Sequence, residues 1–191
     1  MRKLLPMVAV LAVLWVAPST ANPYLSTPAG AIDLFGDTMG LNELIYDVQP
    51  GLLSVYVVHT GKPIGGAAAC QFSAPKPACF TGIYLSDSNP FPVTIGTSQT
   101  GVSIGYGSCR QYPVHVQTIT FFSQGTTGDC CLYPVLPDPN EPGGQVVVVD
   151  CNQQLVPVTG GATVVNLTHR ACWTVSAEET SWGKVKSLYT E

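Results

Sequence analysis

The sequence predicts an all-β protein, an antiparallel β-sandwich that ends in one short C-terminal helix. Gly and Pro are abundant, with 19 Gly and 16 Pro among 191 residues, whereas charged residues make up only 10%. Helix-rich domains usually carry many Glu, Lys and Arg, so this composition favours strands and turns. Short apolar or alternating runs recur between Gly/Pro-rich turns, and no helical pattern long enough for a βαβ unit separates them.

The first 21 residues have the pattern of a signal peptide. Arg2 and Lys3 precede an apolar run over 4–16, and Ser19 and Ala21 supply the small residues of a cleavage site. The run is shorter than the ~20 residues that a membrane-spanning helix needs. We therefore expect export, with a secreted, extracellular or periplasmic location and no membrane span after signal removal.

The mature chain, 22–191, is acidic. Without Arg2 and Lys3, six basic residues remain against twelve acidic ones, which gives a net charge of −6. Nucleic acids and anionic membranes bind clustered Lys and Arg, so neither is an expected partner.

Each expected strand is an alternating or wholly apolar run that ends at a turn signal. In chain order these strands are 31–35, 52–59, 67–73, 82–86, 101–107, 114–122, 130–135, 145–151 and 162–168. Turn segments such as SAPKPA, SDSNPFP and LPDPNEPGG separate them. No internal repeat or long linker divides the strands, so we expect one domain over 22–177, an immunoglobulin-like or cohesin-like sandwich.

The tail, 178–191, differs because its apolar residues fall at helical intervals. Trp182, Val185 and Leu188 share one side of the expected helix. Gly183 and the short length make such a helix marginal alone, so these side chains must dock on an apolar surface. That surface belongs either to the same domain, which we favour, or to a partner.

Seven cysteines stand at positions 70, 79, 109, 130, 131, 151 and 172. Their spacing contains no CxxC pair or Cys/His cluster, so no metal is expected. Neighbouring side chains on a strand point to opposite faces, so Cys130 and Cys131 are expected to form two different disulfides.

Hairpin symmetry suggests the partners of these cysteines. In a hairpin, residues at equal distances from the centre of the turn face each other. Cys70 and Cys79 lie at equal distances from a point inside SAPKP, and Cys131 and Cys151 lie at equal distances from a point inside PDPNEPGG. Cys151 and Cys172 are also nearly symmetric about TGG, so Cys151 keeps two candidate partners. The expected set is Cys70–Cys79, Cys131–Cys151 and Cys109–Cys130, with Cys172 as the free thiol.

Few residues indicate catalysis, and no cofactor is expected because no glycine-rich phosphate loop is present. GVSIG (101–105) matches the G-x-S-x-G elbow, but no helical pattern follows, so Ser103 is expected inside a strand. The three histidines are isolated from one another: His59, His115 and His169. Three carboxylates share one segment without the spacing of a calcium loop, so we expect them to be solvated: Asp37, Glu43 and Asp47.

Five tyrosines are candidates for binding a glycan. A carbohydrate-binding module needs coplanar, exposed rings on one sheet face, but tyrosines of this spacing are expected in the core. The candidates are Tyr56, Tyr84, Tyr106, Tyr112 and Tyr133. NLT at 166–168 is a sequon for N-glycosylation.

Four segments together resemble a group of secreted β-sandwich proteins from environmental bacteria that have no assigned activity. They are GLLSVYVVHT…AAACQFSAP, IGTSQTGVSIGYGSC, CCLYPVLPDPN and ETSWGKVKSLY. The resemblance covers most of the mature chain and implies scattered cysteines and a closing W-G-x-[IV]-K-[AS]-L-[YF] tail. It implies no catalytic residue.

These observations predict a secreted, disulfide-stapled, non-catalytic module that acts in extracellular or cell-surface binding or structure. A protein or a glycan is the expected partner. The alternatives are a small secreted hydrolase that uses Ser103 or a carboxylate pair, and a carbohydrate-binding module.

Overall fold

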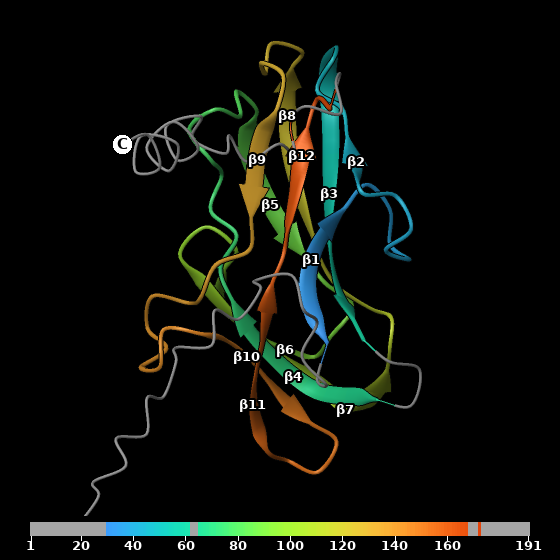
Figure 1. Ribbon diagram of the computed structural model, residues 1–191, viewed down its shortest axis with the longest axis vertical. Helices are drawn as coiled ribbons and strands as arrows, with labels where there is room; N and C mark the ends of the chain where they lie inside the picture. Colours follow the sequence, from blue (N-terminus) through green and yellow to red (C-terminus); the bar gives the residue numbers. More distant parts are fainter. Residues whose placement is uncertain (1–29, 62–64, 168–171, 173–191) are drawn as a thin grey trace, which may run out of the picture.

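The protein is described by a computed structural model over residues 30–61, 65–167 and 172. The described residues form twelve strands (Figure 1). They are β1 (Ala31–Phe35), β2 (Leu44–Ile45), β3 (Pro50–Thr60), β4 (Gly66–Phe72), β5 (Ile83–Ser88), β6 (Val93–Thr97), β7 (Gly101–Gln111), β8 (Val114–Gln124), β9 (Cys131–Pro134), β10 (Val146–Asp150), β11 (Leu155–Gly160) and β12 (Ala162–Val165). The expected signal peptide, 1–21, and tail helix, 178–191, lie outside the described residues.

Nine strands form a continuous sheet in the order β5-β8-β3-β1-β11-β10-β4-β7-β6, and β2, β12 and β9 form a smaller sheet. The large sheet folds over between β1 and β11, so that its halves become the two layers of a sandwich (Figure 1). Side chains meet across the layers: His59 Nδ1 on β3 lies 3.4 Å from the Tyr106 hydroxyl on β7. Among the described strands, all pairings except β1–β11 and β2–β12 are antiparallel. The predicted antiparallel β-sandwich is confirmed.

The core lies between the layers and is built from alternate residues of the strands. In β7, Val102, Ile104 and Tyr106 are buried in the core, and Ser103 faces the other side of the sheet. In β8, Ile119 and Phe121 are buried in the same way. Each such side chain contributes about 1.5–3 kcal/mol by leaving water. The period-2 pattern in the sequence therefore locates the core correctly.

Three strands, β2, β6 and β11, were not predicted, and proline explains two of these omissions. Pro90 and Pro92 precede β6, and Pro157 lies inside β11. Pro157 pairs with Val147 of β10, but β1 pairs only with Thr159 and Gly160 further along β11. The proline thus precedes the part of β11 that is paired on both sides, where its missing N–H would break a ladder hydrogen bond. β2 has only two residues, too few for a periodic pattern.

Three disulfides crosslink the chain, and adjacent Cys130 and Cys131 belong to different bridges, as predicted. The exposed Cys130 has a left-handed backbone (φ 60°), whereas Cys131 is buried. The Cα–Cα distances are 5.5, 5.1 and 5.1 Å, respectively, for Cys79–Cys131, Cys109–Cys151 and Cys130–Cys172.

The predicted partners are wrong in every case. Cys70 is the free thiol, buried in β4, and Cys172 is paired. Hairpin symmetry fails because β9 and β10 are not neighbours: β9 pairs with β12, while β10 lies between β4 and β11. Cys131 and Cys151 therefore never face each other across a turn.

Candidate functional site

Ser103 lies in the middle of β7, as expected, and not on an exposed elbow. It pairs with Gln71 of β4 on one side and Ile95 of β6 on the other. A nucleophile elbow needs a strand-to-helix turn that lifts the serine out of the sheet. Ser103 lies between these two strand neighbours and therefore does not have the geometry of a nucleophile elbow.

The two described histidines lie on different strands and have separate partners. His59 is fully buried in β3, and its ring centroid lies 4.5 Å from that of Tyr112. On β8, His115 Nε2 lies 2.9 Å from the Thr118 hydroxyl, and burial lowers the pKa of its imidazole. His169 lies outside the described residues. In the described part of the chain, no three His, Cys, Asp or Glu side chains gather into a metal site.

Of the three carboxylates between residues 37 and 47, two lie in an exposed loop and one is buried. Asp37 caps its own loop, because its carboxylate accepts the backbone N–H of Met39 at 2.7 Å and that of Asn42 at 2.5 Å. Glu43 is exposed, and its carbonyl accepts the Thr163 hydroxyl at 2.6 Å. Asp47, by contrast, is only 1% exposed, so the expectation that it is solvated is wrong.

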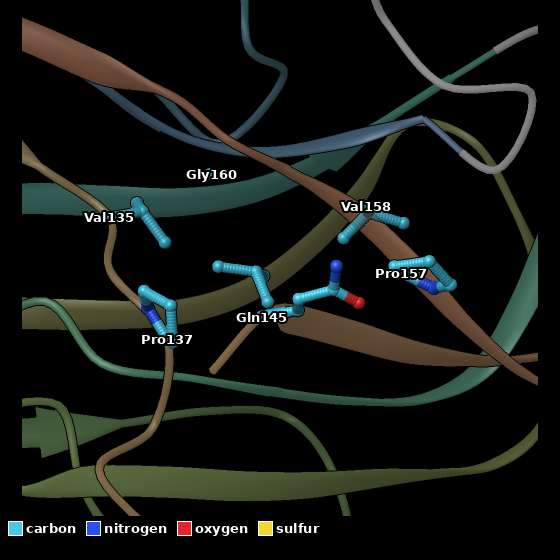
Figure 2. Close-up of a pocket in the computed structure, with 7 residues that line it drawn as sticks. Val135, Pro137, Gln145, Pro157, Val158 and Gly160 are labelled. Carbon is cyan, nitrogen blue, oxygen red and sulfur yellow. The ribbon is translucent and has the colours of Figure 1, made fainter. Parts of the chain in front are cut away.

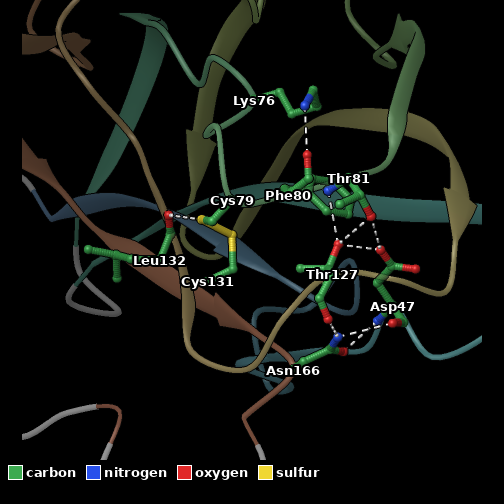
Figure 3. The surroundings of a disulfide bond; sticks show 9 residues. All are labelled: Asp47, Lys76, Cys79, Phe80, Thr81, Thr127, Cys131, Leu132 and Asn166. Atoms are coloured by element: carbon green, nitrogen blue, oxygen red, sulfur yellow. Dashed lines mark hydrogen bonds between the residues drawn. A yellow bond between two sulfur atoms is a disulfide. The ribbon is translucent and has the colours of Figure 1, made fainter.

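Asp47 is held by hydroxyl and backbone donors from β8 and the segment that follows it, of which Figure 3 shows Thr127. The hydroxyls of Ser123 and Thr127 donate to its two carboxylate oxygens, and the N–H of Gly125 donates at 2.7 Å. Burial alone would raise the pKa of Asp47, but these donors outweigh it and lower the pKa below its ordinary value. The carboxylate is thus ionised and its acceptors are engaged, which suits a structural role better than proton transfer.

Asn166 joins the backbone of Asp47 to that of Thr127 (Figure 3) and to that of Cys130. Its Oδ1 accepts the N–H of Asp47 at 2.7 Å, and its Nδ2 donates to the carbonyls of Asp47 at 3.0 Å and Thr127 at 2.6 Å. The carbonyl of Asn166 accepts the N–H of Cys130 at 3.2 Å. Asn166 is 5% exposed, so its amide is a crosslink of the fold and not an open acceptor for a glycan.

Asp33 of β1 is a perturbed carboxyl that the sequence does not single out. A Cβ placed on Gly161 would lie 1.0 Å from its Oδ1, so the carboxyl fills the space that this glycine leaves. Burial, and to a smaller extent the charge of Glu43, raise the pKa of Asp33 to about 6. A single acidic residue inside the run AIDLF resembles an ordinary strand residue, so no pattern in the sequence marks it.

The free thiol lies in a buried cluster on the inner sides of the two layers. Burial raises the pKa of Cys70 to about 12, against opposing hydrogen bonds from Tyr106 and the Ile104 backbone. A reactive cysteine needs an accessible thiolate with a low pKa. Cys70 is therefore a core residue and not a nucleophile.

The five candidate tyrosines do not form an exposed platform. Tyr106 and Tyr133 are fully buried, as expected, and the other three are half-buried. Tyr84 packs its edge against Phe121, with 6.1 Å between ring centroids, and Tyr56 meets the ring of His115 at 5.7 Å. Coplanar exposed rings, which a sugar-binding face requires, are not among these arrangements.

One hollow on the surface, of about 410 Å³, lies between the segment after β9 and the strands β10 and β11 (Figure 2). Val135, Pro137, Pro157 and Val158 line it, and Gln145 supplies its one side-chain amide. A catalytic pocket needs convergent polar groups, and this lining does not provide them.

A row of exposed apolar side chains crosses the outer face of β3, β8 and β5. Leu52 pairs in register with Phe122, and Phe122 with Ile83. Their exposed fractions are 76%, 43% and 51%. Residues in register on neighbouring strands share a face, so these three side chains form one apolar row, the term used below. Sequence reasoning missed the row because consecutive apolar residues such as Leu52 and Leu53 do not show which one faces outwards.

Among the described residues, no helix is long and apolar enough to cross a membrane.

No protein-family model matches the chain. No curated protein matches it. The solved structures to which the chain is similar include cohesin modules. The seventh ScaB type I cohesin from Pseudobacteroides cellulosolvens is 14% identical, covers 73% of this chain and 93% of its own, and has a TM-score of 0.43.

Two further cohesins give similar values. The module from a Clostridium perfringens family 33 glycoside hydrolase is 7% identical over 71% of this chain and 97% of its own, with a TM-score of 0.43. The sixth cohesin of scaffoldin B from Acetivibrio cellulolyticus, solved in complex with a Cel5 dockerin, is 13% identical over 72% and 97%, with a TM-score of 0.36. Similarity at this level assigns neither a family nor a partner, so the function rests on the residues of this chain.

Proposed function

We propose that the chain is an exported, non-catalytic β-sandwich module that binds a protein partner through the apolar row. The observation that carries this proposal is the exposure of Leu52, Phe122 and Ile83 in register on three neighbouring strands. Contiguous apolar side chains on a soluble surface are typical of protein interaction sites. The signal-like N-terminus and the three disulfides support export into an oxidising compartment.

The charge of the domain indicates the chemistry of this partner. The domain, 22–177, carries nine acidic residues and only four basic ones, a net charge of −5. A complementary surface therefore has an apolar centre bordered by Lys and Arg, because opposite charges at the rim favour encounter and orientation. A glycan would instead require exposed planar rings, which favours a protein.

Two isoleucines on opposite edges of the large sheet provide a matched test. Ile83→Asp places a charge in the apolar row on β5, whereas Ile95→Asp places one on β6, where Ile95 is 70% exposed. Chemical crosslinking of the mature chain in its producing cells should capture one partner with the wild type and Ile95→Asp. Ile83→Asp should lose it. Equal capture by both variants would contradict the proposed face.

The hydrolase alternative makes a different prediction for the same preparation. Ser103→Ala should leave partner capture and thermal unfolding unchanged, because Ser103 is a strand residue on the outer side of β7. Esterase or protease activity that disappears with Ser103→Ala would favour the hydrolase over the binding module.

A further inference from the structure

A groove of about 310 Å³ lies where the segment after β2 meets the start of β3. Tyr46, Val48 and Leu52 line it, and all three are exposed apolar side chains. Ser123, which holds the Asp47 carboxylate, also lines it. An aromatic side chain has about 150–250 Å² of surface to bury, and three apolar residues around a hollow offer a place to bury it.

The Cys130–Cys172 disulfide fixes the start of the C-terminal segment near this groove. The N–H of Cys130 donates to Asn166, and Asn166 accepts the N–H of Asp47, the residue between Tyr46 and Val48. From Cys172 onward the segment is long enough to reach the groove. Residues 173–177 alone span roughly 16 Å when extended, before a helix over 178–189 begins.

Charge does not drive this contact. The domain, 22–177, carries nine acidic and four basic residues, a net charge of −5, and the tail, 178–191, carries three acidic residues and two lysines, a net charge of −1. Docking therefore depends on burial of the apolar side chains of the tail.

We propose that the tail of this chain docks on its own domain, with Trp182 in the groove formed by Tyr46, Val48 and Leu52. Val185 and Leu188, on the same side of the expected helix, extend this contact along Leu52. The inference goes beyond the proposed function, because it assigns an occupant to the groove beside the apolar row.

Tryptophan fluorescence of the mature chain, 22–191, tests this docking. Trp173→Phe leaves Trp182 as the only tryptophan, so emission and acrylamide quenching report on this residue alone. We expect blue-shifted emission that is protected from the quencher. Val48→Asp should reduce the docked-to-free ratio about tenfold or more, because a charge in an apolar contact is costly. Ile95→Asp, remote in the sheet order, should leave emission unchanged.

Other occupants of the groove would overturn the proposal in distinguishable ways. Protection of Trp182 that grows with protein concentration, together with a dimer in light scattering, would indicate a second copy. Quenching equal to that of the denatured chain would indicate a tail that stays free for an external partner. Unchanged emission in Val48→Asp would place Trp182 elsewhere.

A crosslink provides a second measurement that does not depend on Val48→Asp being folded. In a monomer, Val48→Cys with Trp182→Cys should form a disulfide, identified by peptide mapping. Ile95→Cys with Trp182→Cys should not. Equal yields from both pairs would overturn the docking. Because Val48 lies outside the apolar row, either result leaves the Ile83→Asp test of the partner face unaffected.

Discussion

At the scale of single residues, the carboxyl of Asp33 makes the stability of the fold depend on pH. Its carboxyl fills the space beside Gly161 and lies near Glu43, and its pKa is raised to about 6. At pH values between 3.8, the pKa of this carboxyl in the unfolded chain, and about 6, Asp33 is protonated in the folded chain but ionised in the unfolded chain. Its contribution to stability is therefore present below about pH 4 and is lost as the pH rises to about 6.

Asp33→Asn should abolish this pH dependence. The amide cannot ionise, so the variant should be more stable than the wild type by about 1–3 kcal/mol at neutral pH and nearly equal to it near pH 4. Urea unfolding across this pH range measures the difference. A constant difference at all pH values would show that the carboxyl of Asp33 does not titrate as described.

The buried amide of Gln117 on β8 also lowers the stability of the fold. Its side chain is fully buried, and neither its Nε2 nor its Oε1 has a hydrogen-bond partner among the described residues. A buried polar group without a partner costs about 1–3 kcal/mol. Gln117→Met keeps a similar shape and removes this cost, so it should raise the free energy of unfolding by about 1 kcal/mol or more. A lower denaturation midpoint for Gln117→Met would show that the amide is satisfied.

Asp47 stabilises the fold, because both of its carboxylate oxygens have hydrogen-bond donors. Asp47→Asn replaces a charged acceptor with an amide and leaves the hydroxyl of Ser123 or Thr127 facing a donor. The expected loss is about 3 kcal/mol or more of unfolding free energy. Asp129→Asn is the control, since Asp129 is exposed, and it should change stability by less than about 0.5 kcal/mol. Similar losses in the two variants would contradict a structural role specific to Asp47.

At the scale of elements, the sequence predicts most strands but not their neighbours. Alternating apolar residues locate β1, β3, β4, β7 and β8 well, because burial of one face leaves a period-2 pattern, and a wholly apolar run locates β10. β11 was missed because Pro157 interrupts its pattern. Strand order depends on contacts far apart in sequence, such as β4 between β10 and β7, and no local pattern records them.

The disulfides follow from strand order, so their partners were not predictable from spacing. The Asp47 site was hidden for the same reason: Asp47 and Asn166 are 119 residues apart and meet through hydrogen bonds. Proteolysis without reduction should give one pair of peptides joined through Cys109 and Cys151, and one set of three in which the peptide with Cys130 and Cys131 is linked to those of Cys79 and Cys172. Cys70 should react with maleimide only after denaturation. A Cys131–Cys151 peptide in the folded protein would contradict this strand order.

At the scale of the whole molecule, the three disulfides close loops of similar size. Their sequence separations are 52, 42 and 42 residues. Loops of this length contribute about 4 kcal/mol each in the chain-entropy model. Domains of this size have only about 5–15 kcal/mol of stability, so full reduction should unfold the protein or lower its melting temperature by well over ten degrees. A melting temperature that is unchanged after verified reduction would show that the core suffices without them.

The connectivity of these bridges bears on how the chain matures. During the export proposed above, the chain enters the oxidising compartment with its N-terminus first, so its cysteines arrive in sequence order. Pairing each with the next to arrive gives Cys70–Cys79, Cys109–Cys130 and Cys131–Cys151, and none of these bridges is native. The native bridges interleave, and Cys130 must wait for Cys172, near the C-terminus. Exchange by thiolate attack is then needed to reach the native set, so we expect this protein to depend on a disulfide isomerase in its host.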